Sequence, residues 1–174
     1  MIRIERYKDE YRQEMIDMIL SIQNDENHLG FTLEEQPDMG DVESAFFAGA
    51  GMFWMAFEGT ELVGTLGLAK KNEKVGVLKK FFIRKDKRGS GLSIELYDRL
   101  IAFAKEEKLS KIILDTPSIL PRAHRFYERA GFRRITKEDL PVHYEFPDRD
   151  CYLYLLDMEE TTTKDANMHD KEKL

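Results

Sequence analysis

The chain has 174 residues, a length typical of one domain with a sizeable hydrophobic core. Its one cysteine, Cys151, excludes an internal disulfide bond. The opening residues MIRIERYKDEY lack the apolar segment of a secretory signal, and no apolar run approaches the roughly 20 residues that span a bilayer. We therefore expect a soluble, cytoplasmic protein that does not bind membranes.

The net charge of −6 is unevenly distributed along the chain. Residues 13–69 contain eleven acidic residues and no Lys or Arg, whereas residues 70–137 contain nineteen basic and eight acidic residues. Chance clustering on a solvated surface is one explanation. The other is two ligands, a polyanion for the central segment and a cationic or neutral molecule for the N-terminal one. Nucleic acid fits poorly, because the protein is acidic overall and its basic residues are not interleaved with a stripe of aromatic residues.

The first half of the chain predicts one strand, one long helix and a hairpin. Residues 1–6 alternate apolar and polar side chains, which is typical of a strand. Apolar residues recur at three- and four-residue steps over 10–26, which predicts an amphipathic helix. A loop over 28–41 and a short helix over 42–48 follow. Two apolar runs within 52–69, separated by Glu-Gly-Thr-Glu, then predict a hairpin.

The second half predicts strands that alternate with helices. A strand over about 75–83 leads through a turn to a helix that ends near residue 108, and KIILDT then forms a strand parallel to the first. Pro121 begins the next helix and Gly131 ends it. Two closing strands, FRRI and DCYLYLLDM, complete one mixed α/β domain over residues 1–158. Residues 159–174 are polar without periodicity and are expected to form a tail.

The turn between the strand and the first of these helices is rich in glycine and positive charge. Gly89 and Gly91 leave main-chain N–H groups uncovered at a helix N-terminus, which suits a phosphate group. Lys85, Lys87 and Arg88 add positive charge at the same place. A plain connection between strand and helix is the alternative.

Two other phosphate-binding motifs fit this turn less well. The P-loop pattern is absent from the sequence. A dinucleotide-binding fingerprint would use Asp115 for the ribose, but Ile94 occupies the position of its third glycine.

Two sequence blocks carry a family resemblance. RGSGLS, residues 88–93, resembles the acyl-CoA pyrophosphate loop of the GCN5-related N-acetyltransferases, Gln/Arg-x-x-Gly-x-Gly/Ala, with Ser93 where Gly or Ala is usual. RAHRFYERAGFRR, residues 122–134, resembles that family's Ala-x-x-Phe-Tyr-Glu-x-x-Gly-Phe motif. The two blocks occur in the family's order, and the resemblance extends over nearly all of residues 1–158.

The resemblance implies a fold and a coenzyme site. The fold is a mostly antiparallel mixed sheet that contains one splayed parallel strand pair and is flanked by about four helices. Acetyl-CoA is the implied co-substrate. Its pantetheine amides would bond to the main chain of the strand before the turn, and its pyrophosphate would lie on the turn itself. The implied coenzyme-binding residues are Phe82, Ile83, Lys87, Arg88, Gly89, Ser90, Gly91, Leu92 and Ser93.

The same resemblance implies an acid but no base. Tyr127 aligns with the tyrosine that protonates the coenzyme thiolate, and an ordinary phenol pKa of about 10 keeps it protonated at pH 7. Filling space beside its aromatic neighbours is the alternative role for this side chain. The base remains open: Gly-Val-Leu at 76–78 replaces the family's strand glutamate, and Leu120 stands where Asn is frequent. Asp25 and Glu26 are candidates through a water molecule.

The expected function is direct transfer of an acetyl group from acetyl-CoA to a primary amine of a small molecule or peptide. No covalent enzyme intermediate and no metal are expected, since the four histidines, His28, His124, His143 and His169, show no metal-ligand spacing. The acidic N-terminal segment suggests a cationic acceptor, and the family suggests a homodimer. A non-catalytic acyl-CoA-binding sensor or partner module, and an enzyme that uses a longer acyl group, remain the alternatives.

Overall fold

The computed structural model describes residues 1–147 and 149–160. Residues 161–174 of the expected tail lie outside this part. One seven-stranded sheet has the order β1-β2-β3-β4-β5-β7-β6. Its strands are β1 Ile2–Arg6, β2 Met52–Glu58, β3 Glu61–Lys70, β4 Val75–Ile83, β5 Lys111–Pro117, β6 Arg133–Ile135 and β7 Cys151–Asp157. Only β4 and β5 are parallel, and the other neighbours are antiparallel, so the predicted mixed sheet is confirmed.

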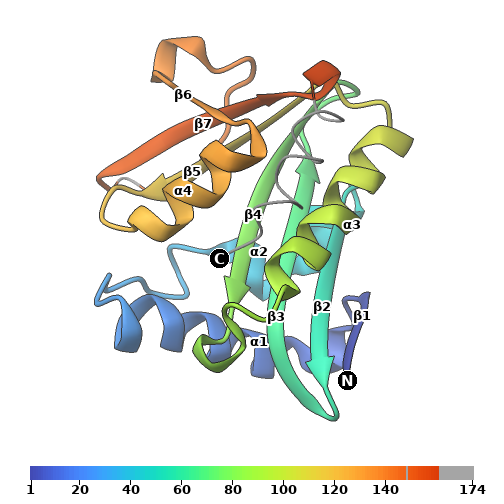
Figure 1. Ribbon diagram of the computed structural model, residues 1–174, viewed down its shortest axis with the longest axis vertical. Helices are drawn as coiled ribbons and strands as arrows, with labels where there is room; N and C mark the ends of the chain where they lie inside the picture. The colour runs from blue at the N-terminus through green and yellow to red at the C-terminus, as the bar shows by residue number, and fades with distance from the viewer. Residues whose placement is uncertain (148, 161–174) are drawn as a thin grey trace.

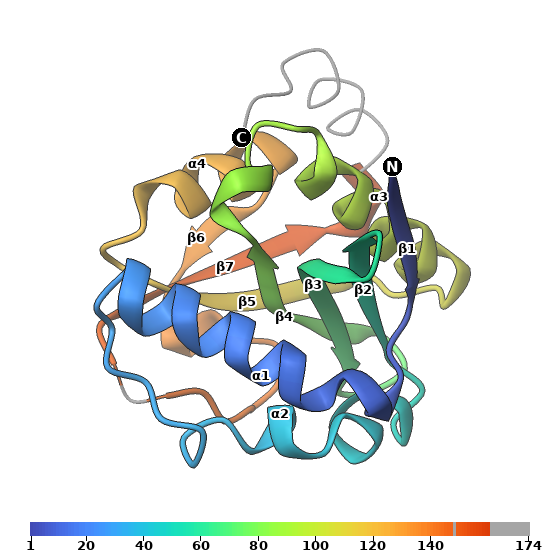
Figure 2. The same ribbon diagram turned by 90° about the horizontal axis from the view of Figure 1, so that it is seen from below.

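Helices cover both faces of this sheet. The α-helices are α1 Arg12–Leu20, α2 Pro37–Gly40, α3 Leu92–Glu106 and α4 Pro121–Ala130. Two π-helical segments lie at Ser21–Glu26 and Glu43–Phe47, and single 3₁₀ turns lie at Asp9–Tyr11, Lys85–Lys87, Lys137–Asp139 and Met158–Glu160. Figures 1 and 2 show α1 and α2 on one face and α3 and α4 on the other. In the described part of the chain, no helix has the length and apolar character needed to cross a bilayer.

One prediction within the N-terminal half was wrong. The segment 28–41 contains the short helix α2, which begins at a proline, rather than being a continuous loop. Proline is well suited to the first turn of a helix, where its missing N–H costs no hydrogen bond. The helix buries Met39 and positions the neighbouring Asp38 beside the sheet.

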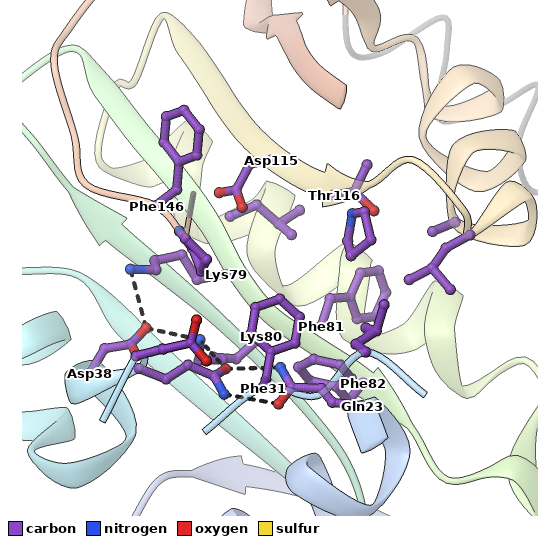
Figure 3. Close-up of a pocket in the computed structure, with 18 of the residues that line it drawn as sticks. Gln23, Phe31, Asp38, Lys79, Lys80, Phe81, Phe82, Asp115, Thr116 and Phe146 are labelled. Atoms are coloured by element: carbon purple, nitrogen blue, oxygen red, sulfur yellow. Dashed lines mark hydrogen bonds and ion pairs between the residues drawn. The ribbon is translucent and has the colours of Figure 1, made fainter. Parts of the chain in front are cut away.

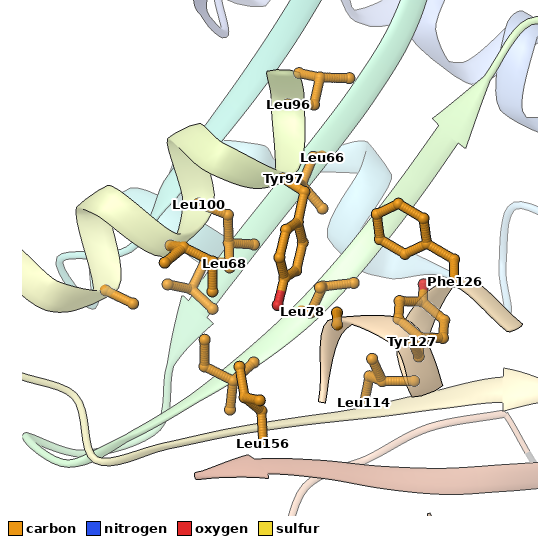
Figure 4. Close-up of a cluster of buried hydrophobic side chains, with 14 of the residues drawn as sticks. Leu66, Leu68, Leu78, Leu96, Tyr97, Leu100, Leu114, Phe126, Tyr127 and Leu156 are labelled. Atoms are coloured by element: carbon orange, nitrogen blue, oxygen red, sulfur yellow. The ribbon is translucent and has the colours of Figure 1, made fainter. Parts of the chain in front are cut away.

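The hydrophobic core has a layer on each face of the sheet. Figure 4 shows the layer under α3 and α4, to which Leu66, Leu68, Leu78, Leu96, Leu100 and Phe126 contribute. The layer under α1 contains Met15, Ile19, Phe46, Phe53 and Met55. Because helices cover both faces, residues 62–69 of β3 are buried without alternation, which explains the nearly continuous apolar run in the sequence.

The parallel strand pair separates after a short paired region. Only residues 75–77 of β4 pair with residues 111–113 of β5. Beyond them the two strands diverge, as Figure 1 shows. The main chain of residues 78–83 therefore has no strand partner on its β5 side, which leaves room for a ligand between the strands.

A β-bulge lies in the diverging part of β4. Thr65 pairs with Phe82 and Gly67 pairs with Lys79, so two residues of β4 lie opposite one residue of β3. The bulged residue Lys80 has a φ of 56°, in the left-handed region. The hydroxyl of Thr65 donates a 2.8 Å hydrogen bond to the carbonyl oxygen of Lys80, which holds the bulge in place.

Candidate active site

Two cavities lie at the opening between β4 and β5. One extends toward α2 and the loop after residue 140 and has a volume of about 460 Å³; the other extends toward the glycine-rich turn and has a volume of about 540 Å³. We call them the α2 cavity and the turn cavity. The two share one wall, formed by Asn27, Phe81, Phe82, Leu120, Ala123 and Tyr127. The two cavities are therefore adjacent.

The turn cavity contains part of the predicted coenzyme site. Phe82, Ile83, Arg88 and Ser93 line it. Arg88 donates from Nε and Nη2 to the carbonyl oxygen of Ile83, at 3.1 and 3.0 Å, and forms an ion pair with Glu26. The guanidinium group is thus fixed at the cavity wall. Its positive charge is neutralised by the carboxylate of Glu26 rather than by a ligand.

The other predicted residues of the turn lie beside the cavity lining. Lys87 forms an ion pair with Glu58, at the end of β2. Leu92 is buried in the core and anchors the first turn of α3. Gly91 precedes that helix with a φ of 89°, a conformation that favours glycine, and no atom lies within 4 Å of where a Cβ would be. The N-terminus of α3 is therefore open, as a bound phosphate group would require.

Tyr127 lies on α4, in the wall that the two cavities share. Only 7% of its surface is exposed, and its ring packs against Phe126, Phe132 and Tyr154. Figure 4 shows it at the edge of the apolar layer. Burial, and next the charge of Asp115, raise the pKa of the phenol above its ordinary value. The phenol therefore stays protonated at neutral pH and is able to donate a proton.

Asp115 is a candidate residue for which sequence reasoning found no catalytic role. It lies on β5 and lines the α2 cavity, as Figure 3 shows. Tyr144 donates a 3.0 Å hydrogen bond to its carboxylate. Burial raises the pKa of Asp115 despite this hydrogen bond and despite the nearby charges of Lys79 and Lys80, which both lower it. An acidic residue just after the apolar run KIIL was the one signal that the sequence offered.

The two bases suggested by the sequence lie away from the α2 cavity. Asp25 is exposed and lines neither cavity. Glu26 lines the turn cavity and is engaged by Arg88. His124 also has a structural contact, because its Nε2 lies 2.9 Å from the carbonyl oxygen of Pro117 and its ring packs on Tyr152.

Comparisons with known proteins agree with this architecture. An acetyltransferase from Streptococcus agalactiae has a crystal structure that superposes with a TM-score of 0.86 and 36% identity, over 90% of this chain and 98% of that one. The N-acetylaspartate synthetase of Danio rerio is 30% identical over 100 residues, which are 56% of this chain and 36% of that protein. The probable N-acetyltransferase family 8 member 5 of Mus musculus is 32% identical over 107 residues, which are 59% of this chain and 47% of that protein.

The matched parts of these curated relatives amount to between about a third and a half of their own lengths. The pattern that describes the Acetyltransferase (GNAT) family matches residues 16–132, which include the C-terminal part of α1, the bulged strand β4, the glycine-rich turn and Tyr127. This range is well over half of the chain, and it confirms the resemblance seen in the two sequence blocks. The chain belongs to the GNAT family of acetyltransferases, enzymes that use acetyl-CoA.

Proposed function

We propose that this protein is an N-acetyltransferase that moves an acetyl group from acetyl-CoA directly to a primary amine of a small molecule or peptide. The observation that carries the proposal is the pair of cavities that meet at the wall containing Tyr127. One cavity is available for each substrate, and the reacting groups would meet at the shared wall. The family membership and the acetyltransferase fold support the same reaction.

The coenzyme is assigned to the turn cavity because the groups there fit its chemistry. The main chain of Phe82 and Ile83 has no strand partner on its β5 side, where the carbonyl oxygen of Ile83 accepts from Arg88, and its remaining groups offer hydrogen bonds to the amides of the pantetheine arm, in the manner of an added strand. The open N-terminus of α3 and the guanidinium group of Arg88 suit the pyrophosphate. Lys87, Gly89, Ser90, Gly91, Leu92 and Ser93 complete the proposed coenzyme site.

Asp115 and Tyr127 are assigned the two proton transfers of the reaction. Acetyl-CoA supplies the acetyl group as a thioester, whose C–S bond breaks as the C–N bond of the product amide forms. Asp115 accepts the proton that the attacking amine releases, and its raised pKa makes it a better base than an exposed carboxylate. Tyr127 donates its phenolic proton to the departing sulfur, and solvent carries the proton from Asp115 back to the phenolate.

The curated relatives support a small acceptor. The name of the Danio rerio relative, N-acetylaspartate synthetase, gives an acetylated amino acid as the product of that protein. A cavity of about 460 Å³ is of the size that binds a small molecule, and a peptide would enter it through its terminal residue.

The test is a thiol-release assay on the full chain with acetyl-CoA and a panel of amines. Free thiol that appears only when an amine is present supports the proposal. Tight binding of acetyl-CoA without turnover of any amine would contradict it and favour the sensor. Calorimetry with coenzyme A, on the natural protein and on Arg88→Glu, measures binding independently of turnover. We expect the charge reversal to weaken binding at least tenfold, because it places a carboxylate against the pyrophosphate.

A further inference from the structure

The wall of the α2 cavity contains two lysines that share one carboxylate. Lys79 Nζ lies 3.1 Å and Lys80 Nζ lies 3.3 Å from the same oxygen, Oδ2 of Asp38. Lys80 also donates a 3.1 Å hydrogen bond to Oε1 of Gln36. Figure 3 shows Asp38 beside Lys79 and Lys80 in the lining of the cavity. Their side chains are 24%, 12% and 10% exposed for Lys79, Lys80 and Asp38, so the cluster is largely shielded from solvent.

The β-bulge brings these two lysines together. Consecutive residues of a regular strand point to opposite faces of the sheet, so neighbouring lysines would normally be far apart. The left-handed conformation of Lys80 interrupts this alternation and allows both ammonium groups to reach Asp38. The pair is therefore a product of the backbone conformation at the point where β4 leaves β5.

The two ammonium groups carry one positive charge more than Asp38 alone neutralises, while burial lowers the pKa of Lys80 and the nearby charges of Asp38 and Asp115 raise it. Burial opposes ionisation of Asp38, but Lys80 and Lys79 outweigh it and hold the pKa of this carboxyl below its ordinary value. Asp38 is thus ionised and compensates one lysine. Ammonium groups carry three donors each, so Lys79 has hydrogen-bonding capacity left for an anion in the cavity.

The carboxylate of Asp115 lies on the β5 wall of the same cavity. The cavity thus has a cationic end on β4 and an anionic group on β5, near the shared wall where Tyr127 lies. A molecule with an amine and one carboxylate complements both. A phosphate dianion fits less well, since the lysines leave only one positive charge uncompensated.

Building on the proposed function, we propose that the acceptor is an amino acid or a similar amino-carboxylate, whose carboxylate binds the Lys79–Lys80 pair while its amine faces Asp115. The pair selects the acceptor and holds its nitrogen in position for attack. Acceptors that lack the carboxylate lose these contacts.

The experiment compares matched amines in the thiol-release assay. Each pair consists of an amino acid and its amide: alanine with alaninamide, and aspartate with its diamide. The two members differ in their carboxylates. Each kcat/KM is calculated from the concentration of the neutral amine, which removes the effect of amine pKa. We expect the carboxylate member of a pair to be acetylated about 10- to 100-fold more efficiently, because charge-assisted contacts are lost in the amide. Equal rates, or a preference for amides, phosphoethanolamine or polyamines, would overturn the inference while the proposed function stands.

Variants locate the effect at the lysine pair. Lys79→Gln should raise KM for alanine about tenfold or more, with little change for alaninamide and little change in kcat, whereas Lys79→Arg should keep the preference. Lys71→Gln removes an exposed lysine outside the cavity and serves as the matched control. An equal effect of Lys79→Gln on both amines would overturn the inference.

A binding measurement separates failure of this inference from failure of the proposed function. If no amine is acetylated, the proposed function fails, and calorimetry with alanine and alaninamide on the coenzyme A-loaded protein replaces the rate assay. Carboxylate-dependent binding that Lys79→Gln abolishes would still support the site. Absence of binding, or binding that Lys79→Gln leaves unchanged, would overturn it.

Discussion

In the proposed mechanism, burial prepares Tyr127 and Asp115 for opposite tasks. Burial raises the pKa of both groups. For a phenol that must donate a proton at neutral pH, the shift preserves the protonated form. For a carboxylate that must accept one, it increases basicity. Burial therefore favours both the proposed acid, Tyr127 on α4, and the proposed base, Asp115 on β5.

Replacing Tyr127 with phenylalanine tests the acid. Tyr127→Phe keeps the ring contacts with Phe126 and Phe132 but removes the proton donor. We expect kcat to fall about 10²- to 10⁴-fold, the usual range for loss of general acid catalysis, with unchanged affinity for coenzyme A. Steady-state kinetics and calorimetry measure the two quantities. Tyr11→Phe, on the opposite face of the sheet, is the control, and full activity of Tyr127→Phe would remove Tyr127 from the mechanism.

Replacing Asp115 with asparagine tests the base through pH dependence. Groups around Asp115 are Lys79 and Lys80 of β4, Tyr144 of the loop and Tyr127 of α4. Activity should rise with pH as Asp115 loses its proton, at a midpoint above the ordinary aspartate pKa of about 3.9. Asp115→Asn should lower kcat about 10²- to 10⁴-fold and remove this limb of the profile. A retained limb in the variant would assign the titration to another group.

The same substitution has a predicted effect on stability. Since the folded-state pKa of Asp115 is raised, the folded protein binds more protons than the unfolded chain between the two pKa values. Stability contributed by this group is therefore present below the unfolded pKa and is lost as pH rises through the folded one. Urea denaturation should show that Asp115→Asn increases the free energy of unfolding at neutral pH but not at pH ~3. A decrease at neutral pH would contradict the cause given for the raised pKa.

At the scale of elements, the bulge of β4 organises the site. It interrupts the regular pairing with β3, brings Lys79 and Lys80 to one carboxylate, and lies where β4 leaves β5. Its main chain is held by the hydroxyl of Thr65, a fully buried group. A change in this one contact should therefore affect both stability and catalysis.

Thr65→Val tests that contact. Valine has the same shape but cannot donate to the carbonyl oxygen of Lys80, so we expect a loss of about 1–3 kcal/mol in the free energy of unfolding. We also expect KM for the acceptor to rise more than kcat falls, since the lysine pair moves with the bulge. Thr60→Val, at the exposed hairpin turn, is the control. Stability loss with unchanged kinetics would show that the bond supports the fold alone.

The strands and helices show which features the sequence could predict. Periodicity and turn residues predicted β1, the hairpin β2–β3, α3 and α4 close to their observed bounds. The two motifs predicted the turn and Tyr127. The resemblance implied the splayed strand pair, but KKFF at 79–82 carries no local signal for a left-handed lysine. The surroundings of Asp115 could not be predicted, because Tyr144, which donates to its carboxylate, comes from a loop 29 residues further along the chain.

At the scale of the whole molecule, the acidic and basic segments that are separate in the sequence form ion pairs with each other in the fold. Acidic residues of the N-terminal segment contact basic residues of the central one, in the pairs Glu26–Arg88, Asp38–Lys79, Asp38–Lys80, Glu58–Lys87 and Glu61–Arg84. The two segments therefore neutralise each other over part of the surface. The acidic segment therefore gives no separate reason to expect a cationic acceptor, and the acceptor that we propose carries a carboxylate.

The pair between Glu26 and Arg88 gives the last prediction. Glu26 occupies Arg88 at the wall of the turn cavity, so a bound pyrophosphate would have to compete with a carboxylate for the guanidinium group. Glu26→Gln weakens this competition. We expect coenzyme A to bind about two- to fivefold more tightly to the variant, the range set by a partly exposed ion pair, and added salt to weaken binding in both proteins.

Calorimetry at low and high salt measures this effect, with Glu61→Gln as the matched control, because Glu61 pairs with Arg84 outside both cavities. Weaker binding in Glu26→Gln would contradict competition and would mean that Glu26 orients Arg88 for the coenzyme. The two outcomes differ in sign because a carboxylate on an arginine either excludes a second anion or fixes the guanidinium plane for it.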